Sequence, residues 1–301
     1  MCEHIVAADI YCELDAAGVS YQTIESRGVL AYVDGRRGDN GRCVVLYADE
    51  YYWDKVLCLT TSLAANADFE GRLYVFFPSD KFVGALDASL FDSHDVVAAV
   101  MPTENFSLKQ GEVLFCPGKM QASRDVLRVK ITPEQVGGAT IANNHVVSAL
   151  SELALRVDSF GGEDCRVQLN DVEAKAEYYP VPHCADFRAT IYCLKEGVRE
   201  SVRSMILGAV AELQYKYDVA VEATVSPCEP CVENDLQLTY EAMLYAREEG
   251  YVVHDGDAEF SSHPFGYLAE HYPSLMYYCG VGDHTDCREL AAVIVKNILN
   301  K

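Results

Sequence analysis

Residues 71–81, GRLYVFFPSDK, set five apolar or aromatic residues in a row between a Gly-Arg pair and a polar Pro-Ser-Asp end. This pattern predicts a β-strand. Helical periodicity precedes it at residues 53–66, and the helical pattern ALDASLF (85–91) and the apolar strand pattern DVVAAVMP (95–102) follow it. Strands and helices that alternate along a chain pack as helices against a sheet, so we expect an α/β sandwich.

The N-terminal region extends this pattern. Residues 2–17 place apolar side chains among acids at helical spacing, and Gly18 stands where such a helix ends. The next segment, GVLAYVDGRRGDNGRCVVLYADE (28–50), holds two β-rich runs around a turn rich in Gly, Asn and Asp. We expect these two runs to pair as a β-hairpin.

Composition and charge exclude several classes of protein. Half of the 301 residues are hydrophobic, and 24 Lys and Arg against 46 Asp and Glu give a formal net charge of −22. A basic surface for nucleic acid is therefore not expected. No apolar run reaches the roughly 18–20 residues of a membrane span, and the first residues lack a cationic start. We expect a soluble, cytoplasmic protein with no membrane partner.

The twelve cysteines are scattered along the chain without an export signal, which favours reduced thiols over a disulfide framework. The pair Cys228-Glu-Pro-Cys231 has a spacing that suits zinc or redox chemistry. Neither a second pair nor a strand-to-helix context accompanies it. We interpret it as a loop with two incidental thiols, and their role stays open.

The pattern changes after Met120. Residues 121–231 follow the order strand, helix, two strands, helix, strand, which predicts a small α+β domain with helices on one face of its sheet and an edge available for pairing. The first pattern resumes after residue 231. We therefore expect a discontinuous α/β domain, residues 1–120 and 232–301, interrupted by an inserted domain at 121–231.

This arrangement resembles the aminoacylase and carboxypeptidase family of dinuclear zinc hydrolases, in its amidohydrolase branch. The segments that carry the resemblance follow in family order: SRGVLAYVDG (26–35), CVVLYADE (43–50), GRLYVFFPSD (71–80), GEVLFCPGKMQASRD (111–125), PHCADFRATIYCLKEGVRESV (182–202) and HPFGYLAEHYPSLMYYCGVGD (263–283). The resemblance implies a three-layer α/β/α catalytic-type domain and an inserted α+β, ferredoxin-like lid and dimerisation domain.

The chemistry of that family needs two zinc ions bridged by a carboxylate, because clustered positive charge acidifies water and polarises an amide carbonyl. The resemblance keeps one ligand aspartate as Asp49, but it aligns Tyr51 with a second aspartate. Asp80 takes the place of the general-base glutamate. Lys81 takes the place of a metal-binding glutamate, where its ammonium opposes a cation. This comparison predicts a dismantled metal site.

The remaining expected ligands change as well. Met101 aligns with a strand histidine, the lid histidine has no counterpart, and His263 begins the segment that replaces Glu-Asp-Phe. Only His284 is left as a terminal ligand. We therefore predict no metal and no cofactor, and a remnant cleft at Asp49, Asp80, His263 and His284 with no assigned catalytic residue.

The predicted function is that of a non-catalytic binding or assembly protein on an amidohydrolase and peptidase scaffold. The candidate pocket residues, for a small-molecule or peptide ligand, are Tyr51, Trp53, Lys81 and Met101. We expect a homodimer formed through the lid domain. The alternative is a divergent metal-dependent amidohydrolase, with zinc in a rebuilt site, acting on N-acyl amino acids or small peptides.

Overall fold

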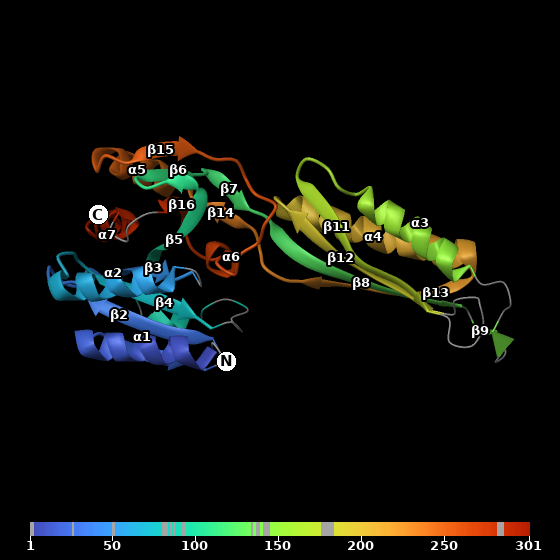
Figure 1. Cartoon of the computed structure of the whole chain (residues 1–301), viewed down its shortest axis with the longest axis horizontal. Coiled ribbons are helices and arrows are strands. Elements are labelled where there is room, and N and C mark those ends of the chain that lie inside the picture. The colour runs from blue at the N-terminus through green and yellow to red at the C-terminus, as the bar shows by residue number, and fades with distance from the viewer. Residues whose placement is uncertain are drawn as a thin grey trace. The chain divides into compact units, whose positions relative to one another are not determined.

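The structure is a computed structural model. It describes residues 3–301 except 26, 50–51, 80–83, 85, 87, 92–93, 134, 137–138, 141–144, 176–183 and 282–285. The chain forms two compact units (Figure 1). Unit 1 comprises Met1–Met120, Val232–Asp257 and Pro264–Lys301, and unit 2 comprises Gln121–Cys231 and Ala258–His263.

Unit 1 is built on one mixed sheet with the order β1-β2-β4-β3-β5-β16-β6-β15 among the described strands. Strands β4, β3, β5 and β16 run parallel to one another. The strands of this sheet are β1 (Ser20–Ile24), β2 (Gly28–Asp34), β3 (Arg42–Tyr47), β4 (Arg72–Pro78), β5 (Asp95–Lys109), β6 (Glu112–Phe115), β15 (Val252–Asp255) and β16 (Ser274–Val281). Two shorter strands, β14 (Val232–Asn234) and β7 (Gly118–Gln121), pair separately.

Helices cover both faces of this sheet, which gives three layers. One apolar core lies between the sheet and the helices α1 (Glu3–Ala17), α2 (Trp53–Asn66), α5 (Leu236–Glu248) and α7 (Asp286–Leu299). The core of the other face includes residues of the short helices η1 (Ala88–Phe91) and α6 (Gly266–Ala269). The α/β/α sandwich expected from the sequence is confirmed.

The central strands are apolar on both sides because both faces are covered. In β4, the run Leu73–Phe77 is buried throughout, with Leu73, Val75 and Phe77 in one core and Tyr74 and Phe76 in the other. This alternation follows from the two-residue repeat of a strand. The predicted strand at residues 71–81 is therefore a central strand of the sheet.

The predicted hairpin between the two runs of residues 28–50 is wrong. Strand β2 pairs antiparallel with β4, and β3 pairs parallel with β4, so β4 lies between them. The turn-rich segment between β2 and β3 instead meets the residues before β4, where the N–H of Gly35 donates to the carbonyl of Gly71 and that of Gly71 donates to the carbonyl of Gly38. Because β4 is buried on both faces, it takes a central position and pairs with both apolar strands.

Unit 2 follows the order β8 (Ser123–Pro133), α3 (Val146–Asp158), β11 (Cys165–Lys175), β12 (Cys184–Cys193), α4 (Glu196–Tyr217), β13 (Val219–Pro227). Its antiparallel sheet has the order β11-β12-β8-β13, the topology of a ferredoxin-like fold. A separate described pair joins β9 (Gln135–Val136) to β10 (Ala139–Thr140).

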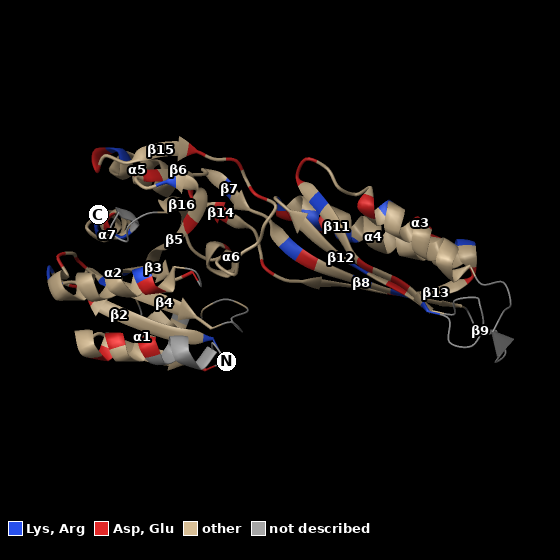
Figure 2. Ribbon diagram, viewed as in Figure 1, with Lys and Arg blue, Asp and Glu red and all other residues tan. Residues whose placement is uncertain are grey.

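The core of unit 2 lies between its sheet and its two helices. Helix α4 contributes a stripe at helical spacing that consists of Val202, Ile206, Ala209, Val210 and Leu213. The opposite side chains of β8, such as Arg128 and Lys130, are exposed. Figure 2 shows basic and acidic residues interspersed on β8 and β12, and Lys130 lies opposite Asp186 in the register.

None of the described helices combines the length and the apolar character needed to cross a bilayer.

Candidate functional site

The carboxyl ends of the parallel strands are where an α/β sheet of this kind forms its ligand site. In unit 1 these ends bring together the segment after β3, the middle of the long strand β5 and the first turn of α2. Asp49 follows β3, and the N–H of Tyr52 donates to the Asp49 carbonyl at 2.9 Å, which fixes the chain as it enters α2.

Asp49 is 5% exposed and is held by a neutral donor. The hydroxyl of Thr103 on β5 donates to Asp49 Oδ2 at 2.5 Å, and Thr103 is itself 7% exposed. Register places Leu46 of β3 opposite Val100 of β5, so residues three further along each strand meet at the same level. The sheet geometry therefore aligns this hydroxyl with the carboxylate.

An ion pair lies beside this contact in sequence. The ammonium of Lys55, in the first turn of α2, pairs with the carboxylate of Glu104, the residue after Thr103. The two side chains are 12% and 14% exposed. Lys55 also lies over the ring of Tyr52, 4.8 Å from its centroid. A charge pair with so little access to water depends on both partners, because removing one leaves the charge of the other without compensation.

Two of the predicted pocket residues, Trp53 and Met101, lie among the described residues, and both side chains pack against the cores of unit 1. Trp53 begins α2 and packs, partly buried, against the first core of unit 1. Met101 is fully buried in the second core. Tyr51 and Lys81 lie outside the described residues, so their placement is not part of the structure.

The predicted remnant cleft is described only in part. Asp49 lies at the strand ends of unit 1, whereas His263 belongs to unit 2, where it is partly buried. Asp80 and His284 lie outside the described residues. The sequence did not single out Thr103, Glu104 or Lys55. The sequence pattern could have indicated Thr103 and Glu104, because they directly follow the apolar run that ends at residue 102. Strand β5 continues through them and brings these polar residues to the level of Asp49.

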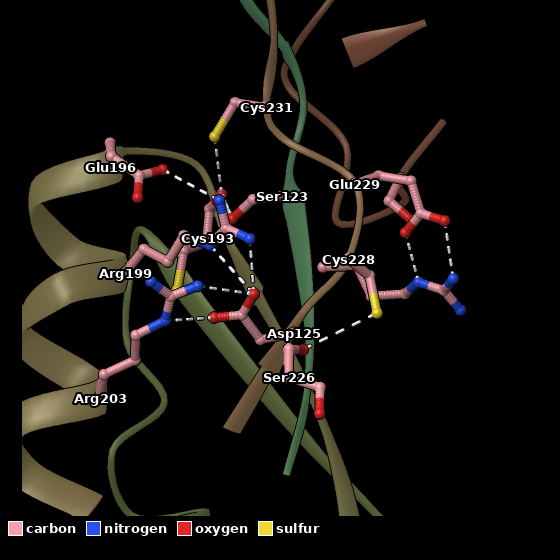
Figure 3. A network of polar contacts seen from close by, with 12 residues as sticks. Ser123, Asp125, Cys193, Glu196, Arg199, Arg203, Ser226, Cys228, Glu229 and Cys231 are labelled. Atoms are coloured by element: carbon pink, nitrogen blue, oxygen red, sulfur yellow. Dashed lines mark hydrogen bonds and ion pairs between the residues drawn. The ribbon is translucent and has the colours of Figure 1, made fainter. Parts of the chain in front are cut away.

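Unit 2 holds a second buried carboxylate, shown in Figure 3. Asp125 on β8 is 2% exposed and accepts hydrogen bonds from two arginines of α4. Arg199 donates to Oδ1 from Nε at 3.0 Å and from Nη2 at 2.6 Å, and Arg203 donates to Oδ2 from Nε at 2.8 Å. Burial lowers the pKa of Arg199, but the bonds to Asp125 outweigh it and raise that pKa. This cluster fastens α4 to the sheet.

The thiols of Cys228 and Cys231 also lie in unit 2 and are partly buried. Cys231 Sγ donates to the carbonyl of Cys193 at 3.3 Å, and Cys228 Sγ lies 3.8 Å from the carbonyl of Ser226 (Figure 3). Burial is the largest cause that raises the pKa of each thiol. Protonated, hydrogen-bonded thiols are poor metal ligands, because the thiolate is the ligand.

No protein-family model and no curated protein matches the sequence. Solved structures do match the fold. A protein described as an aminohydrolase from methicillin-resistant Staphylococcus aureus is 16% identical, with a TM-score of 0.81 over 99% of this chain and 92% of that one. The YXEP protein of Bacillus subtilis, described as a dinuclear metal-binding peptidase of the M20 family, is 15% identical, with a TM-score of 0.80 over 98% and 92%.

A third match is the aminobenzoyl-glutamate utilization protein of Klebsiella pneumoniae, which is 15% identical, with a TM-score of 0.71 over 98% of this chain and 89% of that one. The chain thus has the fold of M20 peptidases and amidohydrolases over nearly its whole length. Identities this low establish a common fold.

The described residues do not fit the dinuclear metal centre that this fold implies. No group of three or more His, Cys, Asp or Glu side chains suited to a metal ion occurs among them. Of the acids identified at the strand ends, Asp49 accepts a hydrogen bond from a hydroxyl and Glu104 is paired with an ammonium. A divalent cation needs carboxylates that are free to coordinate, so this donor set is suited to internal pairing.

Proposed function

We propose that this protein uses the M20-type fold without dinuclear metal catalysis and acts by binding or assembly. The observation that carries the proposal is the Lys55–Glu104 pair. It commits Glu104 on β5 to an ammonium of the chain itself, and Asp49, the other acid identified at the strand ends, accepts a hydrogen bond from Thr103. An ammonium can neutralise a carboxylate, but it cannot act as a Lewis acid or lower the pKa of a bound water as a metal ion does.

The energetic argument points the same way. Recruiting Glu104 to a metal ion requires breaking a nearly buried ion pair and leaving Lys55 with an uncompensated charge, which is costly. Freeing Asp49 Oδ2 requires loss of its short bond from Thr103. A small-molecule or peptide ligand held at these strand ends needs neither change.

The test is metal content, measured by plasma mass spectrometry on protein purified without chelator and challenged with zinc, manganese and cobalt. We expect less than about 0.1 metal ion per chain. A genuine zinc site binds tightly enough to retain its metal through purification, so a content this low indicates that the chain has no such site. One or two ions per chain, lost on Asp49→Ala and accompanied by hydrolysis of N-acyl amino acids or dipeptides, would overturn the proposal in favour of a divergent amidohydrolase.

A matched pair of variants sharpens the test. Lys55→Met removes the ammonium and leaves Glu104 without its cation, whereas Lys109→Met removes a positive charge at the last residue of β5, the strand that carries Glu104. Metal uptake that rises in Lys55→Met and not in Lys109→Met supports the view that Lys55 occupies the role of a cation. Equal uptake in the two variants contradicts it.

We further propose that unit 2 forms a homodimer. Strands β11 and β13 are the outer strands of its described sheet, and outer strands present backbone groups that can pair with another chain. Large apolar side chains are also exposed in this unit, namely Val172 on β11, Leu155 on α3, and Leu207 and Tyr215 on α4. A stable interface buries about 800 Å² on each partner, and aromatic and apolar side chains contribute to its centre.

Light scattering after size exclusion tests this assembly. We expect about twice the 33.3 kDa chain mass, and a shift toward monomer in Leu155→Asp or Val172→Lys. Leu244→Asp is the matched control, because Leu244 is similarly exposed but lies on α5 in unit 1. A monomer at every concentration, or dissociation by the control alone, would contradict assembly through unit 2.

A further inference from the structure

Two buried cysteines face each other across neighbouring strands of unit 2. Cys165 begins β11 and Cys193 ends β12, and they are direct partners in the antiparallel register. Their Sγ atoms lie 3.6 Å apart. Cys165 is 4% exposed and Cys193 is fully buried, and both belong to the core between sheet and helices.

The hydrogen bonds around this pair define its geometry. The backbone of Cys165 bonds to Gly162 through both its N–H and its carbonyl, and the carbonyl of Cys193 accepts from Ser123 Oγ and Cys231 Sγ. The hydrogen bond between the two strands is made by the neighbouring residues Asp164 and Leu194, where the N–H of Leu194 donates to the Asp164 carbonyl at 2.9 Å. Cys165 and Cys193 therefore occupy a non-hydrogen-bonded position of the ladder.

This position suits a disulfide. Directly opposed residues at non-hydrogen-bonded positions have Cα atoms about 4.5 Å apart, which lies within the roughly 4.4–6.8 Å range of disulfide-bonded cysteines. Because the two sulfurs are already adjacent, small side-chain rotations bring them to bonding distance.

The two thiols differ in acidity. The hydrogen bond from the Cys193 thiol lowers the pKa of Cys165, although burial opposes this shift. The same hydrogen bond, together with burial, raises the pKa of Cys193. The thiolate is the reactive form, and Cys165 is the thiol placed to supply it, because it begins β11 and keeps slight exposure while Cys193 is fully buried. It also lies next to the exposed turn at residues 161–163, the side from which a small oxidant can arrive.

We propose that Cys165 and Cys193 are a redox-modification site, which a small hydroperoxide converts into a cross-strand disulfide. The Cys165 thiolate attacks one oxygen of the peroxide and becomes a sulfenic acid as the O–O bond breaks and hydroxide leaves. The Cys193 thiol then loses its proton and attacks Cys165 Sγ, and the sulfenic oxygen leaves as water. The two sulfurs together lose two electrons, which reduce one hydroperoxide to its alcohol and water, or to two waters when the oxidant is hydrogen peroxide.

The experiment maps thiols in the folded chain. N-Ethylmaleimide first blocks the exposed thiols, such as Cys12 and Cys58, and hydrogen peroxide is then added. After unfolding, trypsin separates the relevant cysteines, because Cys165 lies in VDSFGGEDCR, Cys193 in ATIYCLK and Cys184 in AEYYPVPHCADFR. We expect the first two peptides to appear linked by a bond that dithiothreitol cleaves, with the loss of two titratable thiols per chain.

Variants add a second readout. In Cys193→Ser the sulfenic acid at Cys165 has no resolving partner, so we expect over-oxidation to sulfinic acid at Cys165. Cys184→Ser is the matched control on the same strand and should retain the linked peptides. Wild-type protein decides the outcome even if Cys193→Ser does not fold. Peptides containing Cys165 and Cys193 that stay unlinked after peroxide, or that link instead to Cys228 or Cys231, would overturn the proposal.

Discussion

The two units bury a carboxylate in different ways. In unit 2, Asp125 is held by two arginines that reach from α4 to β8, so charge is balanced where it is buried. In unit 1, Asp49 accepts a hydrogen bond from the neutral hydroxyl of Thr103, and a separate ion pair joins Lys55 to Glu104, the next residue of β5. The first arrangement is suited to joining two elements. The second joins the segment after β3 to the neighbouring strand β5 through a hydrogen bond from a hydroxyl.

The largest effect is expected at Asp125. Asp125→Asn keeps the shape but removes the charge that compensates Arg199, whose side chain is 7% exposed. Breaking a buried pair in this way costs about 3–5 kcal/mol in the free energy of unfolding. Urea unfolding followed by circular dichroism measures it. Asp186→Asn, on the neighbouring strand and less buried, is the control and should cost under about 0.5 kcal/mol.

A loss of less than about 1 kcal/mol in Asp125→Asn would contradict the contrast between the units. It would mean that the two arginines relax into solvent at little cost. Arg203, which is 26% exposed, has more freedom to do so than Arg199, so Arg199→Met should be the more harmful of the two single arginine changes.

The next effect is expected at Lys55. Lys55→Met leaves Glu104 nearly buried without its cation, and we expect a loss of about 2–3 kcal/mol, less than at Asp125 because both side chains keep some access to water. Trp53, the single tryptophan, lies two residues away and reports the unfolding of unit 1 by fluorescence. Adding Glu104→Gln to Lys55→Met should recover part of the loss, since the unpaired charge is removed. Two independent, additive losses would show that the pair is not coupled.

Much of the fold follows from periodicity. Apolar runs identified the central strand at residues 72–78, and the six elements of unit 2 follow the expected order, because one face of each element is buried and repeats at the spacing of its secondary structure. Pairing between strands was less accessible. The hairpin prediction for residues 28–50 was wrong because local turn residues show where a chain can reverse but not that β4, further along the chain, inserts between the two strands.

The site was harder to predict than the fold. Asp49 was found by resemblance, and the structure buries it at the strand ends. Its partner Thr103 comes from a strand 54 residues away in sequence, and no local pattern marks a threonine as a hydrogen-bond donor to that carboxylate. Similarly, Cys165 and Cys193 meet only through the register of β11 and β12. Long-range register is not encoded in the spacing of the residues themselves.

A smaller effect is expected from the hydroxyl of Thr103. Thr103→Val keeps the shape and removes the donor to Asp49, and a lost hydrogen bond to a charged group costs about 1.5–3 kcal/mol. Because Asp49 is 5% exposed and has little access to water, we expect the free energy of unfolding to fall by about 2 kcal/mol. Trp53 fluorescence during urea unfolding measures this loss. Thr103→Ser keeps the hydroxyl and is the control. Equal losses in the two variants would show that the methyl group matters rather than the hydrogen bond.

The smallest effect on stability is expected at Glu152, whose polar contacts lie nearer the surface than those of the two buried carboxylates. Glu152 on α3 accepts hydrogen bonds from Lys216 at 2.6 Å, Tyr217 at 2.7 Å and Arg156 at 2.7 Å. These bonds, led by that from Lys216, lower the pKa of Glu152 from about 4.5 to about 2. Because the folded-state pKa is depressed, the stabilisation is present above about pH 4.5 and is lost as the pH falls toward about 2.

Glu152→Gln should therefore lower the urea midpoint at pH 7, and the difference from wild type should shrink through this acid range. Concentrated salt should also reduce the difference at pH 7, since exposed charges are screened, whereas the loss in Asp125→Asn should change little. A difference that stays constant down to pH 2, and in salt, would mean that Glu152 stabilises the helix pair by packing rather than by charge.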